Sequence, residues 1–169
     1  MIRPAVEADA EALAALYNHY VLHTVTTFET QPIDAAEMAH RVETVQNQQL
    51  PWLVLDRAGV VCGYACAIRW KARAAYAFSA ESTIYLAQGL TGQGLGAPLY
   101  RELLGQLTAR GYHTVLGGIA LPNAASVALH ESLGFTQVAH LREVGRKFDR
   151  WIDVGYWQCL LPATANQTG

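Results

Sequence analysis

The sequence of 169 residues predicts one domain of the mixed α/β class, spanning residues 1–161. Its length is typical of a single domain, which at this size buries roughly 70% of its unfolded surface. Hydrophobic residues make up 51% of the chain and charged residues 15%, which excludes a disordered polyelectrolyte. Strand-like and helix-like apolar patterns both occur along the chain, so we expect helices and strands around one core.

Two amphipathic helices and a β-hairpin are predicted in the first part of the chain. Apolar residues recur three and four positions apart in residues 9–20, after a short strand at 2–6. A second helix is predicted at 34–48. The apolar runs 51–56 and 60–68 are separated by a turn whose glycine can adopt a positive φ. We therefore predict that these two runs pair as a hairpin.

A strand, a glycine-rich turn and a helix follow in the middle of the chain. The apolar run 76–87 predicts a strand, and leucines recurring on one face predict a helix at 98–110. A further strand is predicted at 113–119. Asn123 is a good N-cap and glycine commonly ends helices, so the next helix is expected between Asn123 and Gly134.

Two strands close the predicted domain. Residues 135–144 and 151–161 are apolar runs, and the charged segment 146–150 between them is expected to form the turn. Residues 162–169 lack apolar periodicity and are expected to be a disordered tail.

Charge and composition restrict the partners and the compartment. The net charge of -2 provides no basic field for nucleic acid or an anionic membrane, so neither partner is expected. The N-terminus lacks a signal-peptide pattern and no apolar run reaches membrane-spanning length, so a cytoplasmic protein is expected. Cys62, Cys66 and Cys159 are too few for a disulfide framework and are expected to be core thiols.

The strongest chemical signal is the glycine-rich segment between the predicted strand and helix. Gly92, Gly94 and Gly96 let backbone amides approach an anion at the positive end of the helix, which predicts a phosphate or diphosphate site. Gly92, Gly94 and Ala97 also fit the dinucleotide fingerprint of a Rossmann fold. That fold needs an acidic residue about 20 positions later, and residues 112–117 contain none. The motif also normally opens the sheet, whereas here helices and a hairpin come first. We therefore reject the Rossmann interpretation.

Two motifs resemble those of the GNAT superfamily of N-acetyltransferases. The glycine-rich segment matches the superfamily signature, which is Arg or Gln, two residues, Gly, one residue, and Gly or Ala. Thr91 departs from the first position of that signature. A second superfamily pattern matches the spacing of Asn123, Ser126 and His130, with a histidine where the family has a tyrosine.

Further stretches resemble the phosphinothricin and methionine sulfoximine acetyltransferase branch of this superfamily. They are residues 27–30, 71–76, 81–85, 121–123 and 153–158. The resemblance extends from Ile2 to Leu161. It implies the GNAT fold, an α+β arrangement in which helices flank a central, mostly antiparallel mixed sheet with splayed strands. It also implies acetyl-coenzyme A as cosubstrate, a small amino-acid-like substrate and a homodimer.

The resemblance assigns roles in catalysis to single residues. Glu81 matches the proposed general base of the branch, and His130 stands where relatives place the acid that protonates the departing thiolate. Strand alternation puts Glu81, Thr83 and Tyr85 on one face, and a backbone amide near Leu86 would polarise the thioester carbonyl. The alternatives are a strand-end glutamate and a structural histidine.

Coenzyme contacts are expected along the glycine-rich loop and beside it. The expected residues are Tyr85, Leu86, Gly92, Gln93, Gly94, Leu95, Gly96, Ala97, Asn123, Ser126 and Ser132. Because Asn123 and Ser126 are also good helix-start residues, capping and coenzyme binding are compatible.

A basic loop indicates the charge of the substrate. The ammonium of Lys71 and the guanidinium of Arg73 suit carboxylate or phosphinate oxygens, which predicts an acidic amino-acid analogue. By resemblance, the substrate-binding residues are Phe28, Lys71, Arg73, Tyr76, Thr83 and Val154. Without the resemblance, a solvated surface loop is the better interpretation.

Several alternatives stay open at this point. The substrate could be another amine, such as a polyamine, an aminoglycoside or a protein N-terminus, and the chain could be a coenzyme-binding sensor without turnover. Among acidic analogues, the sequence does not separate phosphinothricin, methionine sulfoximine, methionine sulfone and the arsenic analogue arsinothricin. His19 and His23 have the spacing of two metal ligands but lack a third, so no metal is expected.

Overall fold

A computed structural model describes residues 1–163, and the tail predicted at 162–169 therefore lies mostly outside the described residues. The strands are β1 (Ile2–Pro4), β2 (Trp52–Arg57), β3 (Val60–Arg69), β4 (Ser79–Leu86), β5 (Thr114–Leu121), β6 (Thr136–Lys147) and β7 (Arg150–Leu160). The helices are α1 (Ala10–His23), α2 (Ala35–Asn47), α3 (Gly96–Ala109) and α4 (Ala124–Ser132), with short 3-10 turns η1 (Glu7–Asp9) and η2 (Ala74–Tyr76).

The strands form one sheet in the order β1-β2-β3-β4-β5-β7-β6. Every neighbouring pair is antiparallel except β4 and β5, which run parallel. The pairing of β4 with β5 covers only 79–81 and 114–116, although both strands continue for five more residues. The two strands therefore splay apart in the middle of the sheet, which confirms the mostly antiparallel mixed sheet expected from the resemblance.

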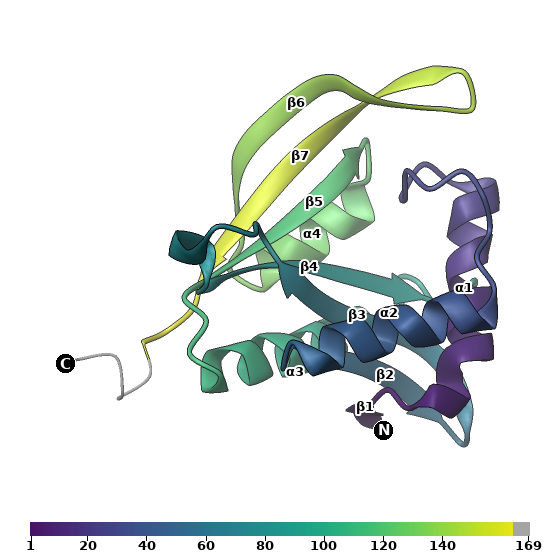
Figure 1. The fold of residues 1–169 in the computed structure, drawn as a ribbon. Coiled ribbons are helices and arrows are strands. Elements are labelled where there is room, and N and C mark those ends of the chain that lie inside the picture. Colours follow the sequence, from purple (N-terminus) through teal and green to yellow (C-terminus); the bar gives the residue numbers. More distant parts are fainter. Residues whose placement is uncertain (164–169) are drawn as a thin grey trace.

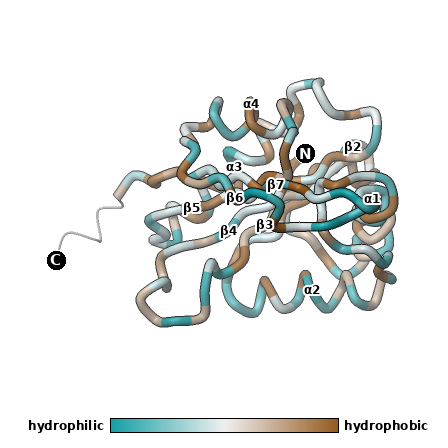
Figure 2. The backbone as a smooth tube through the Cα atoms, turned by 90° about the horizontal axis from the view of Figure 1, so that it is seen from above, coloured by the Kyte–Doolittle hydropathy of each residue, from teal (hydrophilic) through white to brown (hydrophobic). Residues whose placement is uncertain are grey.

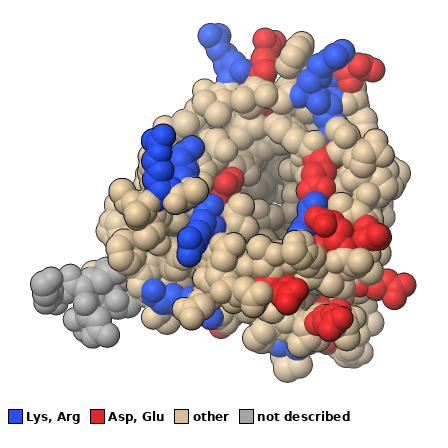
Figure 3. Space-filling view, viewed as in Figure 1, with Lys and Arg blue, Asp and Glu red and all other residues tan. Residues whose placement is uncertain are grey.

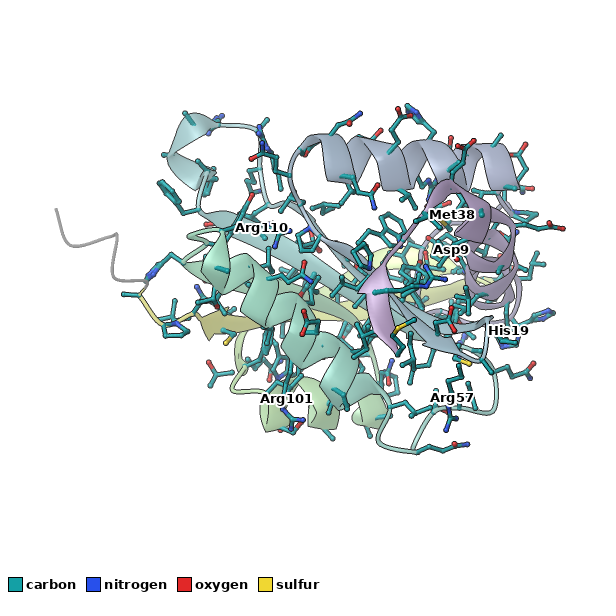
Figure 4. The ribbon with its side chains drawn as sticks, turned by 90° about the horizontal axis from the view of Figure 1, so that it is seen from below. Asp9, His19, Met38, Arg57, Arg101 and Arg110 are labelled. Atoms are coloured by element: carbon teal, nitrogen blue, oxygen red, sulfur yellow. The ribbon has the colours of Figure 1, made fainter. Side chains whose placement is uncertain are left out.

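Helices cover both faces of the sheet. Helix α2 lies on one face, whereas α3 and α4 lie on the other, as the views from the side and from above show (Figures 1 and 2). Seen from below, α3 crosses its face of the sheet with Arg110 near its end (Figure 4). Leu99, Leu103 and Leu107 of α3 are completely buried, because their spacing of four residues places them on one side of the helix.

The hairpin of β6 and β7 projects from the rest of the sheet (Figure 1). Its turn is shorter than the predicted segment 146–150, because Lys147 still pairs with Arg150. The turn consists of two residues, Phe148 and Asp149, with φ of 50° and 57°. A two-residue turn with positive φ at both positions matches the right-handed twist of an antiparallel pair, so the strands extend further than their sequence indicates.

The start of β4 differs from the prediction, whereas the prediction for the cysteines is confirmed. Strand β4 begins at Ser79 rather than at Tyr76, because residues 74–76 form the η2 turn. The three cysteines are free and buried, as expected. Within residues 1–163, no helix is long and apolar enough to cross a membrane.

Candidate active site

A cavity of about 750 Å³ opens on the face of the sheet that α2 covers, and Figure 3 shows it as a hollow. Its floor comes from the central strands and its walls from α1, α2, residues 26–29 and the β6–β7 hairpin. Five of the residues predicted from the sequence line it, namely Phe28, Glu81, Thr83, Tyr85 and Val154. The structure thus brings together positions from three separate parts of the chain.

Glu81, Thr83 and Tyr85 share the cavity face of β4, as strand alternation requires. Between them, Ser82 points to the opposite face, where its Oγ lies 2.6 Å from the Tyr100 hydroxyl oxygen. Burial raises the pKa of the Glu81 carboxyl, and the nearby positive charge of Lys71 partly opposes that shift. A carboxylate with a raised pKa is a better proton acceptor for an amine than an ordinary surface glutamate.

The splay of β4 from β5 leaves backbone groups of β4 without a strand partner. Ala87 N donates to Cys62 O, so the backbone groups of Ala87 point toward β3, and Leu86 pairs with Gly63 at the next position. In an antiparallel pair, every second residue turns its amide and carbonyl away from the partner strand. The Leu86 amide therefore points toward the gap where β5 has diverged, and its carbonyl accepts a hydrogen bond from Tyr20 Oη.

A smaller cavity of about 50 Å³ lies in this gap. It is lined by residues of β4, β5 and α4 with its N-cap, including Thr83, Tyr85, Asn123, Ser126 and His130. Asn123 caps α4, because its Oδ1 accepts from the Ser126 amide at 3.1 Å. Ser132 is exposed at the far end of α4 and does not line this cavity.

The glycine-rich loop leads into α3 with its backbone amides accessible. Gly92 and Gly94 have φ of 76° and 75°, and a side chain at either position would meet open space. Helix α3 begins at Gly96, and no side chain caps it through Leu95. Unpaired amides and the positive end of the helix dipole make this terminus suited to an anion. Gln93 folds back, donating from Nε2 to Gly89 O at 2.8 Å.

His130 is buried in a hydrogen-bonded chain between α3, α4 and β4. Its Nδ1 lies 2.8 Å from Ser126 O and must be the donor, and its Nε2 lies 3.0 Å from the Tyr100 hydroxyl. Burial lowers the pKa of the His130 imidazole. Because both ring nitrogens have partners and the neutral form is favoured, the structure supports the structural interpretation of His130 over a direct proton donor.

The basic loop between β3 and β4 lies outside the cavity lining. Lys71 rests with its Nζ 5.1 Å from the centre of the Trp70 ring, and Trp70 packs edge-on against Tyr156 of the cavity. Arg73 and Tyr76 are exposed and do not line the cavity. Of the three predicted substrate contacts on this loop, only Lys71 lies near enough to affect Glu81.

Charges gather on both sides of the hollow. Basic side chains lie over the β3–β4 loop, and acidic side chains lie over α2 and the segment before it (Figure 3). Within the cavity wall, Arg41 of α2 is already paired, with Nη1 2.6 Å from Glu29 Oε1 and Nε 2.7 Å from Glu37 Oε1. Arg41 is therefore compensated, whereas Lys71 has no salt bridge among the described residues.

The structure adds residues that the sequence interpretation missed. Lys147 is buried at the end of β6 and donates from Nζ to Thr27 O at 2.8 Å. A side chain on Gly145 would collide with the Phe28 ring, so the hairpin holds the segment that carries Phe28. Tyr156 lines the cavity two residues after Val154 on the same face of β7, and strand alternation from Val154 could have identified it.

Comparisons with known proteins agree with this architecture. Residues 2–155 match the family described as "Acetyltransferase (GNAT) domain". The chain is 43% identical to a phosphinothricin N-acetyltransferase of Streptomyces viridochromogenes, over 93% of this chain and 85% of the relative. It is 37% identical to an L-methionine sulfoximine/L-methionine sulfone acetyltransferase of Salmonella typhimurium, over 95% of this chain and 94% of the relative.

A solved structure shows the same fold. The phosphinothricin acetyltransferase of Sinorhizobium meliloti in complex with AcCoA superposes with a TM-score of 0.93 at 36% identity, over 99% of this chain and 91% of that one. The splayed sheet, the open glycine-rich loop and the sequence match all lead to the same result. The chain belongs to the GNAT family of acetyltransferases.

Proposed function

We propose that this protein transfers the acetyl group of acetyl-coenzyme A to the α-amino group of a small acidic amino-acid analogue of the phosphinothricin or methionine sulfoximine type. One observation carries the proposal. The Glu81 carboxyl, with its raised pKa, lines the cavity beside the point where β4 and β5 separate. Named relatives that act on such analogues, and a neighbouring structure that holds AcCoA, support the substrate and the cosubstrate.

The coenzyme would bind across the sheet through the gap between β4 and β5. Its diphosphate meets the amides of residues 92–97 at the start of α3. The pantetheine arm passes the small cavity that Asn123 and Ser126 line, and the thioester carbonyl meets the Leu86 amide. No metal is required in this scheme, because the backbone amides polarise the carbonyl.

Transfer would proceed by direct attack without a covalent enzyme intermediate. The substrate ammonium gives a proton to Glu81, directly or through water, and the free amine attacks the thioester carbon. The carbon–nitrogen bond forms, the carbon–sulfur bond breaks, and the electron pair leaves with the thiolate. The bonded nitrogen then releases its second proton and the thiolate takes one up through water, giving coenzyme A and the acetylated amine.

Charge favours an acidic substrate over a cationic one. The acidic end of the analogue would lie toward Lys71 at the mouth, while its ammonium faces Glu81. Arg73 and Tyr76 would reach the substrate only if the β3–β4 loop moves inward, because they do not line the cavity in this structure. A polyamine or aminoglycoside would bring several positive charges to the same mouth and would be less favoured.

The first test is an assay of thiol release from acetyl-coenzyme A across candidate amines. Phosphinothricin, methionine sulfoximine, methionine sulfone and arsinothricin should be acetylated, whereas spermidine and an aminoglycoside should give rates near the background. A peptide with a free N-terminus serves as the protein-like control. Turnover of the cationic compounds alone would overturn the substrate class, and absence of thiol release with every amine would favour a coenzyme-binding sensor.

We also propose that the protein is a homodimer that pairs through the β6–β7 hairpin. Large apolar side chains are exposed on this hairpin, namely Val138, Leu141, Val144, Phe148 and Trp151. Contiguous exposed apolar surface marks interaction sites in soluble proteins. Light scattering should give twice the 18.4 kDa chain mass for the wild type and a smaller mass for Trp151→Glu. A monomer for the wild type at micromolar concentration would contradict the pairing.

A further inference from the structure

Gly118 leaves an open notch in the middle of the sheet, on the cavity floor. It lies on β5, pairs with Tyr156 of β7 and is exposed to the cavity. A glycine inside a central strand weakens the strand and often marks a place where a ligand approaches the backbone closely. Its neighbour Gly117 has a different reason, because a side chain there would lie 2.5 Å from His130 Nε2 on the opposite face.

The notch is bordered by Glu81 and Tyr156. A Cβ atom at Gly118 would lie 3.4 Å from Glu81 Oε1, 3.2 Å from Tyr156 Cε1 and 3.5 Å from Tyr156 Cζ. The missing methyl group therefore leaves a space in contact with both the carboxylate and the hydroxyl-bearing edge of the phenol. Burial raises the pKa of Tyr156, and the negative charge of Glu81 adds to that shift, which agrees with their proximity.

The Tyr156 hydroxyl is available to a ligand. Its ring is held by an edge-on contact with Trp70, with ring centres 5.4 Å apart. Among the hydrogen bonds of residues 1–163, none involves the Tyr156 hydroxyl, although the residue is half-buried. The hydroxyl is bonded to Cζ, one of the atoms that border the notch. A group in the notch can therefore contact Glu81 and Tyr156 at the same time.

We propose that the notch at Gly118 is the seat of the substrate's amino group, and that Tyr156 is a further catalytic residue that binds it there. This inference rests on the proposed acetyl transfer and specifies how that site holds its nucleophile. The ammonium donates one hydrogen bond to Glu81 and one to the Tyr156 hydroxyl oxygen. After Glu81 takes one proton, the remaining N–H···O contact to Tyr156 orients the amine so that its lone pair faces the thioester.

Two substitutions test the space at Gly118 and the Tyr156 hydroxyl separately. Gly118→Ala puts a methyl group into the notch while keeping the strand, so the KM for the amine should rise at least about 10-fold because the space is filled. Tyr156→Phe keeps the ring and removes only the oxygen, so kcat/KM should fall about 10- to 100-fold, as expected for loss of a hydrogen bond to a charged group. Calorimetric affinity for acetyl-coenzyme A should stay unchanged in both.

Matched controls come from elsewhere in the chain. Gly105→Ala adds the same methyl group in α3, where a Cβ would meet nothing within 4 Å. Tyr112→Phe removes a hydroxyl between α3 and β5, away from the cavity lining. Both controls should keep wild-type kinetics, and thermal unfolding of all four variants shows whether the fold is retained.

The probe is whichever amine the wild-type protein acetylates fastest. If wild-type turnover is present and Gly118→Ala and Tyr156→Phe both match their controls, the amine seat is wrong while the proposed function stands. If the wild type acetylates no amine, the proposed function fails and the seat fails with it. An equal loss of kcat/KM in Tyr156→Phe and Tyr112→Phe would also overturn the role of Tyr156, because a general loss of rigidity would then explain both.

Discussion

Replacing Glu81 by Gln should lower kcat by about 10²- to 10⁴-fold, which is the usual contribution of a general base. The amide keeps the shape of the side chain but cannot accept the proton of the ammonium. Acetyl-coenzyme A affinity, measured by calorimetry, should be unchanged, because the loop at 92–97 is not altered. Glu11→Gln, at an exposed position of α1, is the matched control and should be fully active. A Glu81→Gln variant with wild-type turnover would rule out the general base.

The same variant should change the pH dependence of stability in a defined direction. Burial raises the pKa of Glu81 above its ordinary value, so folding disfavours its ionised form. Below the ordinary glutamate pKa of about 4.3, the carboxyl is neutral in both states and Glu81→Gln should have little effect. As pH rises through the folded-state pKa, the wild type loses stability that the variant keeps. Thermal unfolding near neutral pH should therefore favour the variant, whereas lower stability of the variant there would contradict the burial argument.

Replacing Ala97 by Glu should weaken acetyl-coenzyme A binding about 10- to 100-fold at low salt, because a carboxylate would oppose the diphosphate. Ala97 is the second residue of α3, in its first turn. The same negative charge at a helix N-terminus should stabilise the helix by about 0.3–1 kcal/mol. Loss of coenzyme affinity is therefore expected together with equal or higher thermal stability, which a damaged fold would not produce.

Ala97→Gln separates charge from size in this experiment. The amide has nearly the same volume as the carboxylate, so only the charge differs between the two variants. Calorimetry should give a large difference in acetyl-coenzyme A affinity between Glu and Gln at low salt and a much smaller one at about 1 M salt, where the screening length is about 3 Å. Equal affinities at low salt would mean that the diphosphate does not bind at this turn.

Local patterns predicted most of the secondary structure, and the exceptions have physical causes. Strand β4 was expected to begin at Tyr76, yet the chain there closes a 3-10 turn that an apolar pattern does not reveal. The charged residues at 146–150 indicated a loop, but the cross-strand pairing of Lys147 with Arg150 overrides their polarity. In both places, hydrogen bonding decided the boundary more than side-chain composition did.

The sequence predicted the candidate site unevenly. Strand alternation predicted that Glu81, Thr83 and Tyr85 share one face. The glycine-rich loop was predicted to bind an anion because an anion needs exposed backbone amides. His130 was assigned a proton-donor role by family position, but the structure places both of its ring nitrogens in hydrogen bonds. The role of Gly118 was not predicted, because the space that its missing side chain leaves is defined by residues that are distant in the sequence.

By itself, the sequence determined which groups are available: a mixed α/β order of elements, a carboxylate on one strand face and a flexible loop that exposes amides. These properties are local, since they depend on spacing along the chain and on the backbone freedom of glycine. Tertiary structure decided which groups meet, including the splay of β4 from β5, the burial of Glu81 and its approach to Tyr156 across the sheet. Such contacts join residues far apart in the chain, and only the packing of the strands and helices brings them together.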